Sequence, residues 1–227
     1  MNRPAMPARS LRDGPFPAHR TLPRPTQPRR RAVAVGLVAA SLAIAAAGCS
    51  RGLPVPSEAP LAGAAIGGPF VLADKTGKPV RYGDFDGRYR VLYFGYSFCP
   101  DVCPLDLSHL MQGYHAFARA HPELAGKVQP LFVTVDPARD TPAKVGTYAA
   151  NFGPELIGLT GTPAQVAQAA REWAVFYQKR KGATPATYLM DHSRAAYLMG
   201  PKGEPIALLP ADQSGQAVAD ELAKWVR

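Results

Sequence analysis

Apolar and polar residues alternate in short blocks along residues 68–227. Two apolar runs rich in aromatic and β-branched residues, 89–96 (YRVLYFGY) and 128–135 (VQPLFVTV), predict buried strands. After the first run, apolar positions recur at helical spacing over about 104–120. After the second run, a threonine N-cap and a first-turn proline predict a helix over about 142–152. This strand–helix–strand–helix order predicts a βαβ unit.

Shorter elements are predicted on both sides of this unit. A β-hairpin precedes it, with strands at 70–72 and 80–82. The elements predicted after it are a strand at 156–159, a helix at 163–175 opened by a Thr162–Gln165 capping box, a strand pair at 188–190 and 195–199, a strand at 206–209 and a helix at 214–227. The predicted fold class is α/β: a thioredoxin-like fold with a central mixed sheet, helices on both faces and an N-terminal β-hairpin.

The positive charge of the chain is concentrated at its N-terminus. The formal net charge is +9, and residues 1–31 hold eight arginines and one aspartate. Residues 32–227 hold 18 basic and 16 acidic residues, with no basic stripe interleaved with aromatics. We therefore expect no nucleic-acid binding. The length and the 47% hydrophobic content suit one globular domain with a tail.

The N-terminal segment has the layout of an export signal. Residues 32–48 are uncharged and apolar and directly follow three arginines, although seventeen residues is at the short limit for a membrane-spanning helix. The motif Ala-Ala-Gly-Cys ending at Cys49 resembles a bacterial lipoprotein cleavage site, where the cysteine is lipidated. The alternative is an uncleaved anchor helix. Both interpretations predict a body anchored to a membrane on its extracytoplasmic (periplasmic) side.

These features divide the chain into three parts. Residues 1–48 are a predicted basic disordered tail plus signal or anchor segment, residues 49–67 are a Pro-, Gly- and Ala-rich linker, and residues 68–227 are the folded domain.

Two of the three cysteines stand four positions apart in YFGYSFCPDVCP, residues 93–104. Such a pair could form a structural disulfide, act in redox chemistry or bind a metal, but a disulfide this short would constrain little chain. Pro104 suits the first helical position, which predicts Cys103 at the N-cap and Cys99 in the preceding loop. The free N–H groups and the dipole of a helix start favour a thiolate there.

A closed metal site needs more ligands than two thiolates. The candidates are the five histidines of the chain. His109, His115 and His121 fall on different faces of, or just after, the first helix and are predicted surface residues, while His19 lies in the tail. His192 lies at the end of a predicted strand, and its local pattern alone favours a structural histidine with a satisfied hydrogen bond over a metal ligand.

Three blocks, in this order, resemble the signatures of the Sco (SenC) family: residues 93–104, VDPARDTP at 135–142 and YLMDHSRAAYLMGPKGE at 188–204. That family comprises membrane-tethered, thioredoxin-like copper proteins that assist assembly of cytochrome c oxidase. The resemblance, which covers roughly residues 65–227, implies that Cys99, Cys103 and His192 bind copper. Two soft thiolates and an imidazole suit Cu(I), and could hold Cu(II) with a weak further ligand.

Three aspartates near these blocks have candidate supporting roles. Asp191 could orient His192 as a hydrogen-bond partner. Asp136 could lie beside the site, because loops at the carboxyl ends of neighbouring strands share one edge of the sheet. Asp140 is predicted to serve the turn and the start of the next helix.

Two functions follow from the resemblance and the cysteine pair. The first is a copper chaperone, not an enzyme in the strict sense, that metallates the binuclear copper centre in subunit II of cytochrome c oxidase. Another periplasmic copper chaperone is a candidate donor of its copper, although the sequence does not identify the source. The alternative is a thiol–disulfide reductase that keeps the oxidase cysteines reduced, with Cys99 attacking, Cys103 resolving and a thiol reductant regenerating the pair. Only the first function needs His192.

Overall fold

The computed structural model describes residues 58–184 and 187–227. The predictions for the basic tail, the signal or anchor segment and the lipidated Cys49 lie outside these residues. No helix in the two described ranges combines the length and the apolar character that crossing a membrane requires.

A five-stranded mixed sheet forms the centre of the domain, in the order β5–β4–β3–β8–β9. β3 (Tyr89–Gly95), β4 (Val128–Thr134) and β5 (Ile157–Leu159) are parallel. β8 (Ala196–Met199) and β9 (Pro205–Leu209) are antiparallel to their neighbours. Every residue of β3 and β4 is buried, as expected for strands that are covered on both faces.

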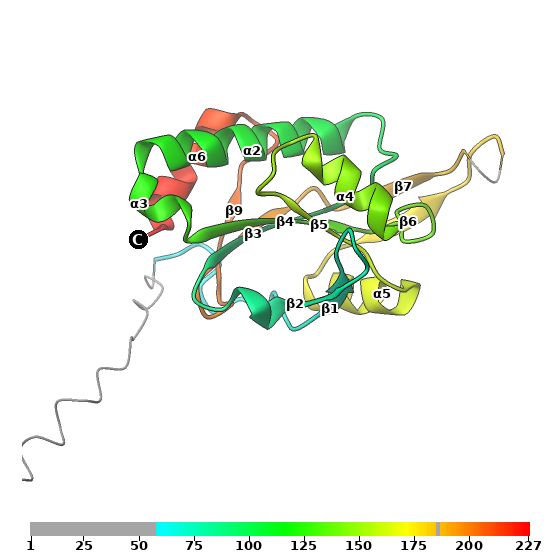
Figure 1. Cartoon of the computed structure of the whole chain (residues 1–227), viewed down its shortest axis with the longest axis horizontal. Helices are drawn as coiled ribbons and strands as arrows, with labels where there is room; N and C mark the ends of the chain where they lie inside the picture. Colours follow the sequence, from blue (N-terminus) through cyan, green and yellow to red (C-terminus); the bar gives the residue numbers. More distant parts are fainter. Residues whose placement is uncertain (1–57, 185–186) are drawn as a thin grey trace, which may run out of the picture. The chain divides into compact units, whose positions relative to one another are not determined.

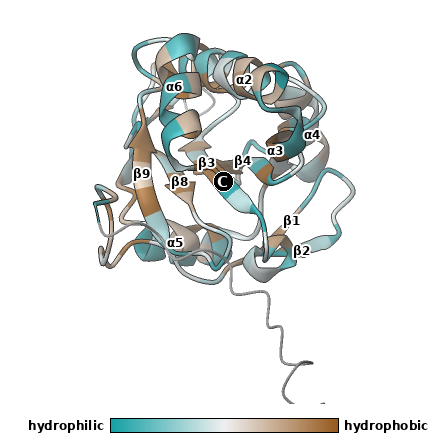
Figure 2. Ribbon diagram, turned by 90° about the vertical axis from the view of Figure 1, so that its left-hand side faces the viewer, coloured by the Kyte–Doolittle hydropathy of each residue, from teal (hydrophilic) through white to brown (hydrophobic). Residues whose placement is uncertain are grey.

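Helices cover both faces of this sheet, as predicted. α2 (Val102–Ala120), α6 (Gly215–Trp225) and α4 (Pro142–Ala150) lie on one face, and α5 (Pro163–Glu172) lies on the other (Figure 1). The apolar strands are enclosed between helices whose outer surfaces are largely polar (Figure 2). The fold is therefore the mixed α/β, thioredoxin-like fold that the sequence predicts.

Several short elements complete the domain. The predicted N-terminal hairpin is confirmed, with β1 (Val71–Ala73) antiparallel to β2 (Pro79–Arg81). A 3-10 helix η1 (Tyr82–Phe85) follows it, and α3 (Pro122–Ala125) follows α2. The end of the predicted linker packs on the domain, since Ala59 is buried there.

The predicted pairing of the strands at 188–190 and 195–199 is wrong. β7 (Leu189–His192) pairs instead with β6 (Tyr177–Arg180), in a separate two-stranded sheet. β6 was not predicted because its last three residues are polar and exposed, so it has no apolar alternation. The β6–β7 hairpin extends away from the central sheet (Figure 1) and holds His192 opposite Tyr177 at its inner end.

Candidate metal centre

The two cysteines lie on the loop after β3 and in the first turn of α2. The helix begins at Val102 with Asp101 as its N-cap, so the prediction that Cys103 is the N-cap is wrong by two positions. Pro104 is tolerated in the first turn because the N–H groups there have no intrahelical acceptor. The free N–H of Cys103 donates to Cys99 Sγ at 3.4 Å. The helix start therefore stabilises a thiolate at Cys99 rather than at Cys103.

His192 reaches the cysteines from the end of β7. Its Nε2 lies 3.0 Å from Cys103 Sγ, and its Nδ1 lies 2.8 Å from the Ser193 carbonyl oxygen. A carbonyl only accepts hydrogen bonds, so Nδ1 carries a proton and Nε2 is the ring nitrogen that faces the cysteines. The rings of Tyr93 and Tyr96 meet the imidazole edge-on, at centroid distances of 6.2 and 5.8 Å.

The predicted ligands come together in one site. The Sγ atoms of Cys99 and Cys103 and a ring nitrogen of His192 all lie within 4.8 Å of one another. Cys103 is fully buried and Cys99 is partly exposed. Two soft sulfurs and one imidazole nitrogen in an open, three-ligand arrangement match the preferences of copper, whereas a structural zinc site would need a fourth ligand.

The two thiols have very different acidities. The pKa of Cys99 lies well below that of a free thiol, mainly because of its hydrogen bond with Cys103 and, to a smaller degree, its contact with His192, and burial opposes this shift. The pKa of Cys103 is raised by the hydrogen bond with Cys99 and by burial. These opposite shifts favour a thiolate on Cys99 and a thiol on Cys103 in the reduced pair. Binding of a metal to both sulfurs would displace the Cys103 proton.

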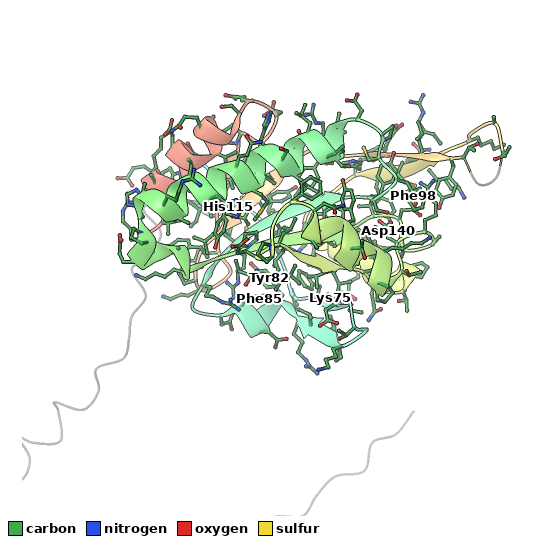
Figure 3. All side chains as sticks on the ribbon, turned by 45° about the horizontal axis from the view of Figure 1, so that its top comes forward. Lys75, Tyr82, Phe85, Phe98, His115 and Asp140 are labelled. Atoms are coloured by element: carbon green, nitrogen blue, oxygen red, sulfur yellow. The ribbon has the colours of Figure 1, made fainter. Side chains whose placement is uncertain are left out.

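Asp140 has a larger role than the turn that was predicted for it. It is fully buried, and it accepts hydrogen bonds from Ser97 N at 3.0 Å, from Ser97 Oγ and from Thr134 Oγ1 at 2.5 Å. Ser97 opens the loop that carries Cys99, so Asp140 fixes the start of this loop to the end of β4. Figure 3 shows Asp140 and Phe98, the residue before Cys99, at the same end of the domain.

Asp191 directly precedes His192 in the sequence and Asp136 follows β4, but among the described residues neither forms a hydrogen bond with Cys99, Cys103 or His192. Asp136 accepts from Tyr188 OH at 2.7 Å and from Arg139 Nε at 2.5 Å, which ties the loop after β4 to the start of β7. The Asp191 carboxylate forms an ion pair with Arg180, in which Arg180 Nε lies 3.4 Å from Asp191 Oδ2. The Ser193 carbonyl, rather than Asp191, accepts from the ring nitrogen of His192.

The other described histidines serve local structure. His109 Nδ1 lies 2.8 Å from the Ala211 carbonyl oxygen, and His115 pairs with Glu155 at 3.1 Å. Figure 3 places His115 toward the opposite end of the domain from Phe98 and Asp140. None of the described histidines except His192 joins the cysteine pair.

The domain has a mixed sheet with helices on both faces, in which a strand leads to a cysteine pair at a helix start and a later strand supplies a histidine. These features define a thioredoxin-like protein with a group of side chains that could hold a metal ion. The comparisons with known proteins agree. The chain belongs to the SCO1/SenC family, whose model matches residues 58–227.

The relatives include mitochondrial and bacterial proteins. The chain is 42% identical to Protein SCO2 homolog, mitochondrial, of Bos taurus. The match covers 172 residues, which is 75% of this chain and 64% of that protein. It is 40% identical over 161 residues to Protein SenC of Rhodobacter capsulatus, 71% of each chain. The structure of Bradyrhizobium japonicum ScoI with copper bound matches at a TM-score of 0.64 with 35% identity, over 71% of this chain and 100% of that one. The chain spans 54–64% of the length of the first mitochondrial relatives.

Proposed function

We propose that this protein is a copper chaperone that binds copper through Cys99, Cys103 and His192 and delivers it to the binuclear copper site in subunit II of cytochrome c oxidase. The observation that carries the proposal is the convergence of two sulfurs and one imidazole nitrogen within 4.8 Å, from two segments far apart in the sequence. Members of the SCO1/SenC family are cytochrome c oxidase assembly factors, which supports an oxidase partner.

The burial of the ligands suits transfer of the metal. Cys99 is partly exposed, and Cys103 is buried against the core. An incoming thiolate of the acceptor can therefore reach the metal on the Cys99 side, where it would replace one ligand before the others dissociate. A three-ligand site leaves coordination space for this associative exchange.

The N-terminal segment would hold the domain at a membrane. The apolar segment 32–48 and the small residues before Cys49 support a signal followed by a lipidated cysteine or an anchor helix. In this arrangement the folded domain works on the extracytoplasmic side, where another periplasmic copper chaperone would supply the metal. Loss of membrane association in a Cys49→Ser variant would distinguish the lipid anchor from the helix anchor.

The cysteine geometry also favours the second function, a thiol–disulfide reductase. The Cys99 thiolate would attack a disulfide of the oxidase subunit, forming a mixed disulfide and releasing one partner thiolate. Cys103 would then lose its proton and attack Cys99 Sγ, which releases the second partner thiolate and leaves a Cys99–Cys103 disulfide. A thiol reductant would reduce this disulfide again. The low pKa and partial exposure of Cys99 support this order of attack.

One experiment separates the two functions. The copper-loaded protein is mixed with the reduced, copper-free soluble domain of subunit II, and formation of the binuclear centre is followed by its visible absorption. In parallel, the copper-free protein is mixed with the oxidised domain, and released thiols are counted. His192→Ala should abolish formation of the copper centre and preserve the release of thiols. His115→Ala, a change at a residue away from the site, should preserve both activities. Failure of the wild-type protein to form the centre would refute the chaperone.

A further inference from the structure

We infer that Arg194 and Asp106 form a positioning pair that holds His192 against the cysteines and thereby sets the strength of metal binding. The inference rests on the proposed function of the site, because it concerns how one of its ligands is held. Neither residue is a ligand, and neither was singled out from the sequence.

The pair joins the two segments that supply the ligands. Asp106 lies on α2, three residues after Cys103, and Arg194 lies two residues after His192. Arg194 Nε donates to Asp106 Oδ2 at 3.0 Å, and Arg194 Nη2 donates to Asp106 Oδ1 at 2.6 Å. These two parallel hydrogen bonds fix both the distance and the relative orientation of the two side chains, which a single hydrogen bond would not do.

Asp106 is also tied to the strand beneath the site. Tyr93 OH, from β3, donates to Asp106 Oδ2 at 2.8 Å, and the Tyr93 ring meets His192 edge-on. The Asp106 side chain is fully buried, while that of Arg194 is 42% exposed. Removal of Arg194 would leave a buried carboxylate without its cationic partner, a costly arrangement.

The hairpin that carries His192 needs such an anchor. β7 pairs only with β6 among the described strands and makes no ladder with the central sheet. The start of β7 is held by Tyr188, whose OH donates to Asp136 and whose carbonyl accepts from Arg139 at 2.9 Å. Arg194 stands at the other end, between β7 and β8, where the hairpin joins the core. The pair therefore stops the ligand-bearing end of the hairpin from moving away from α2.

The test is a double-variant cycle on Cu(I) affinity, measured by competition with a chromophoric ligand. Arg194→Met should weaken Cu(I) binding about tenfold to a hundredfold, the usual effect of losing a group that orients a ligand. In a His192→Ala background the same change should have almost no effect, because the pair acts through His192. Arg194→Lys keeps the positive charge but cannot form the two parallel hydrogen bonds with Asp106, so it should give an intermediate Cu(I) affinity. Arg180→Met, which removes an exposed cation from the same hairpin, should leave affinity unchanged.

A second measurement does not depend on copper. In the reduced, metal-free protein, NMR contacts between the rings of His192 and Tyr93 should be present in the wild type and weaken in Arg194→Met. Unchanged contacts, an unchanged affinity, or equal losses of affinity with and without His192 would each overturn the inference. If the wild type failed to bind Cu(I), the proposed function would fail, and the ring contacts would still decide whether the pair positions His192.

Discussion

The buried carboxylate of Asp140 gives a sharp test of how the cysteine loop is held. Asp140→Ala removes the acceptor of Ser97 N, Ser97 Oγ and Thr134 Oγ1, and Thr134 is fully buried. A hydrogen bond to a charged group contributes about 1.5–3 kcal/mol, and an unpaired buried donor costs about 1–3 kcal/mol. Because the hydroxyls can turn to other acceptors and Ser97 is only half-buried, we expect a loss of about 3 kcal/mol in the free energy of unfolding.

Asp74 provides a matched control on the β1–β2 turn. Its carboxylate also accepts three hydrogen bonds, from Thr76 N, Thr76 Oγ1 and Lys78 N, but all of these groups are exposed. Water replaces the lost acceptor in Asp74→Ala, so the free energy of unfolding should fall by less than about 1 kcal/mol.

Thermal and urea unfolding of both variants measure this difference. For a domain of this size, about 3 kcal/mol corresponds to a fall in Tm of roughly 6–12 °C. Asp140→Ala should also weaken Cu(I) binding, because Ser97 opens the loop that carries Cys99. Equal losses of stability in the two variants would refute the claim that burial makes the Asp140 network important.

Two further predictions concern the cysteines. In Gly95→Ala the new Cβ would stand 3.0 Å from Cys103 Sγ and 3.1 Å from Phe132, so overpacking should cost about 1–3 kcal/mol and weaken Cu(I) binding. Gly126→Ala, whose Cβ meets nothing within 4 Å, should change stability by less than about 1 kcal/mol, and equal effects in urea unfolding would contradict the packing argument. Because the pKa of Cys99 lies below that of a free thiol, its alkylation by iodoacetamide in the reduced, metal-free protein should vary little between about pH 6 and 8. A nearly tenfold rise per pH unit would indicate an ordinary thiol.

Local sequence patterns were sufficient for most of the secondary structure. The buried runs became β3 and β4, and the Thr162–Gln165 capping box opens α5. β6 was missed because a polar, exposed strand has no apolar periodicity. The helix start at Cys103 was misplaced because proline is compatible with any position of the first turn, not only the first.

The site was predicted only in part, because several of its contacts join residues that are far apart in the sequence. The cysteine pair stands out in the sequence, and the resemblance of the 188–204 block supplied His192. The Asp140 network and the Arg194–Asp106 pair join residues 43 and 88 positions apart, and no local pattern encodes such distant partners. Both aspartates are fully buried, a property that a polar residue in a sequence does not reveal.

The central claim is that Cys99, Cys103 and His192 act as one copper site. The most direct test is a Cu(I) titration of the reduced, metal-free domain against a competing chromophoric ligand, for the wild type and for His192→Ala, with His115→Ala as the control. We predict tight one-to-one binding that is greatly weakened in His192→Ala and unchanged in His115→Ala. Weak binding by the wild type, or binding that is indifferent to His192, would contradict the claim and leave the cysteines as a redox pair.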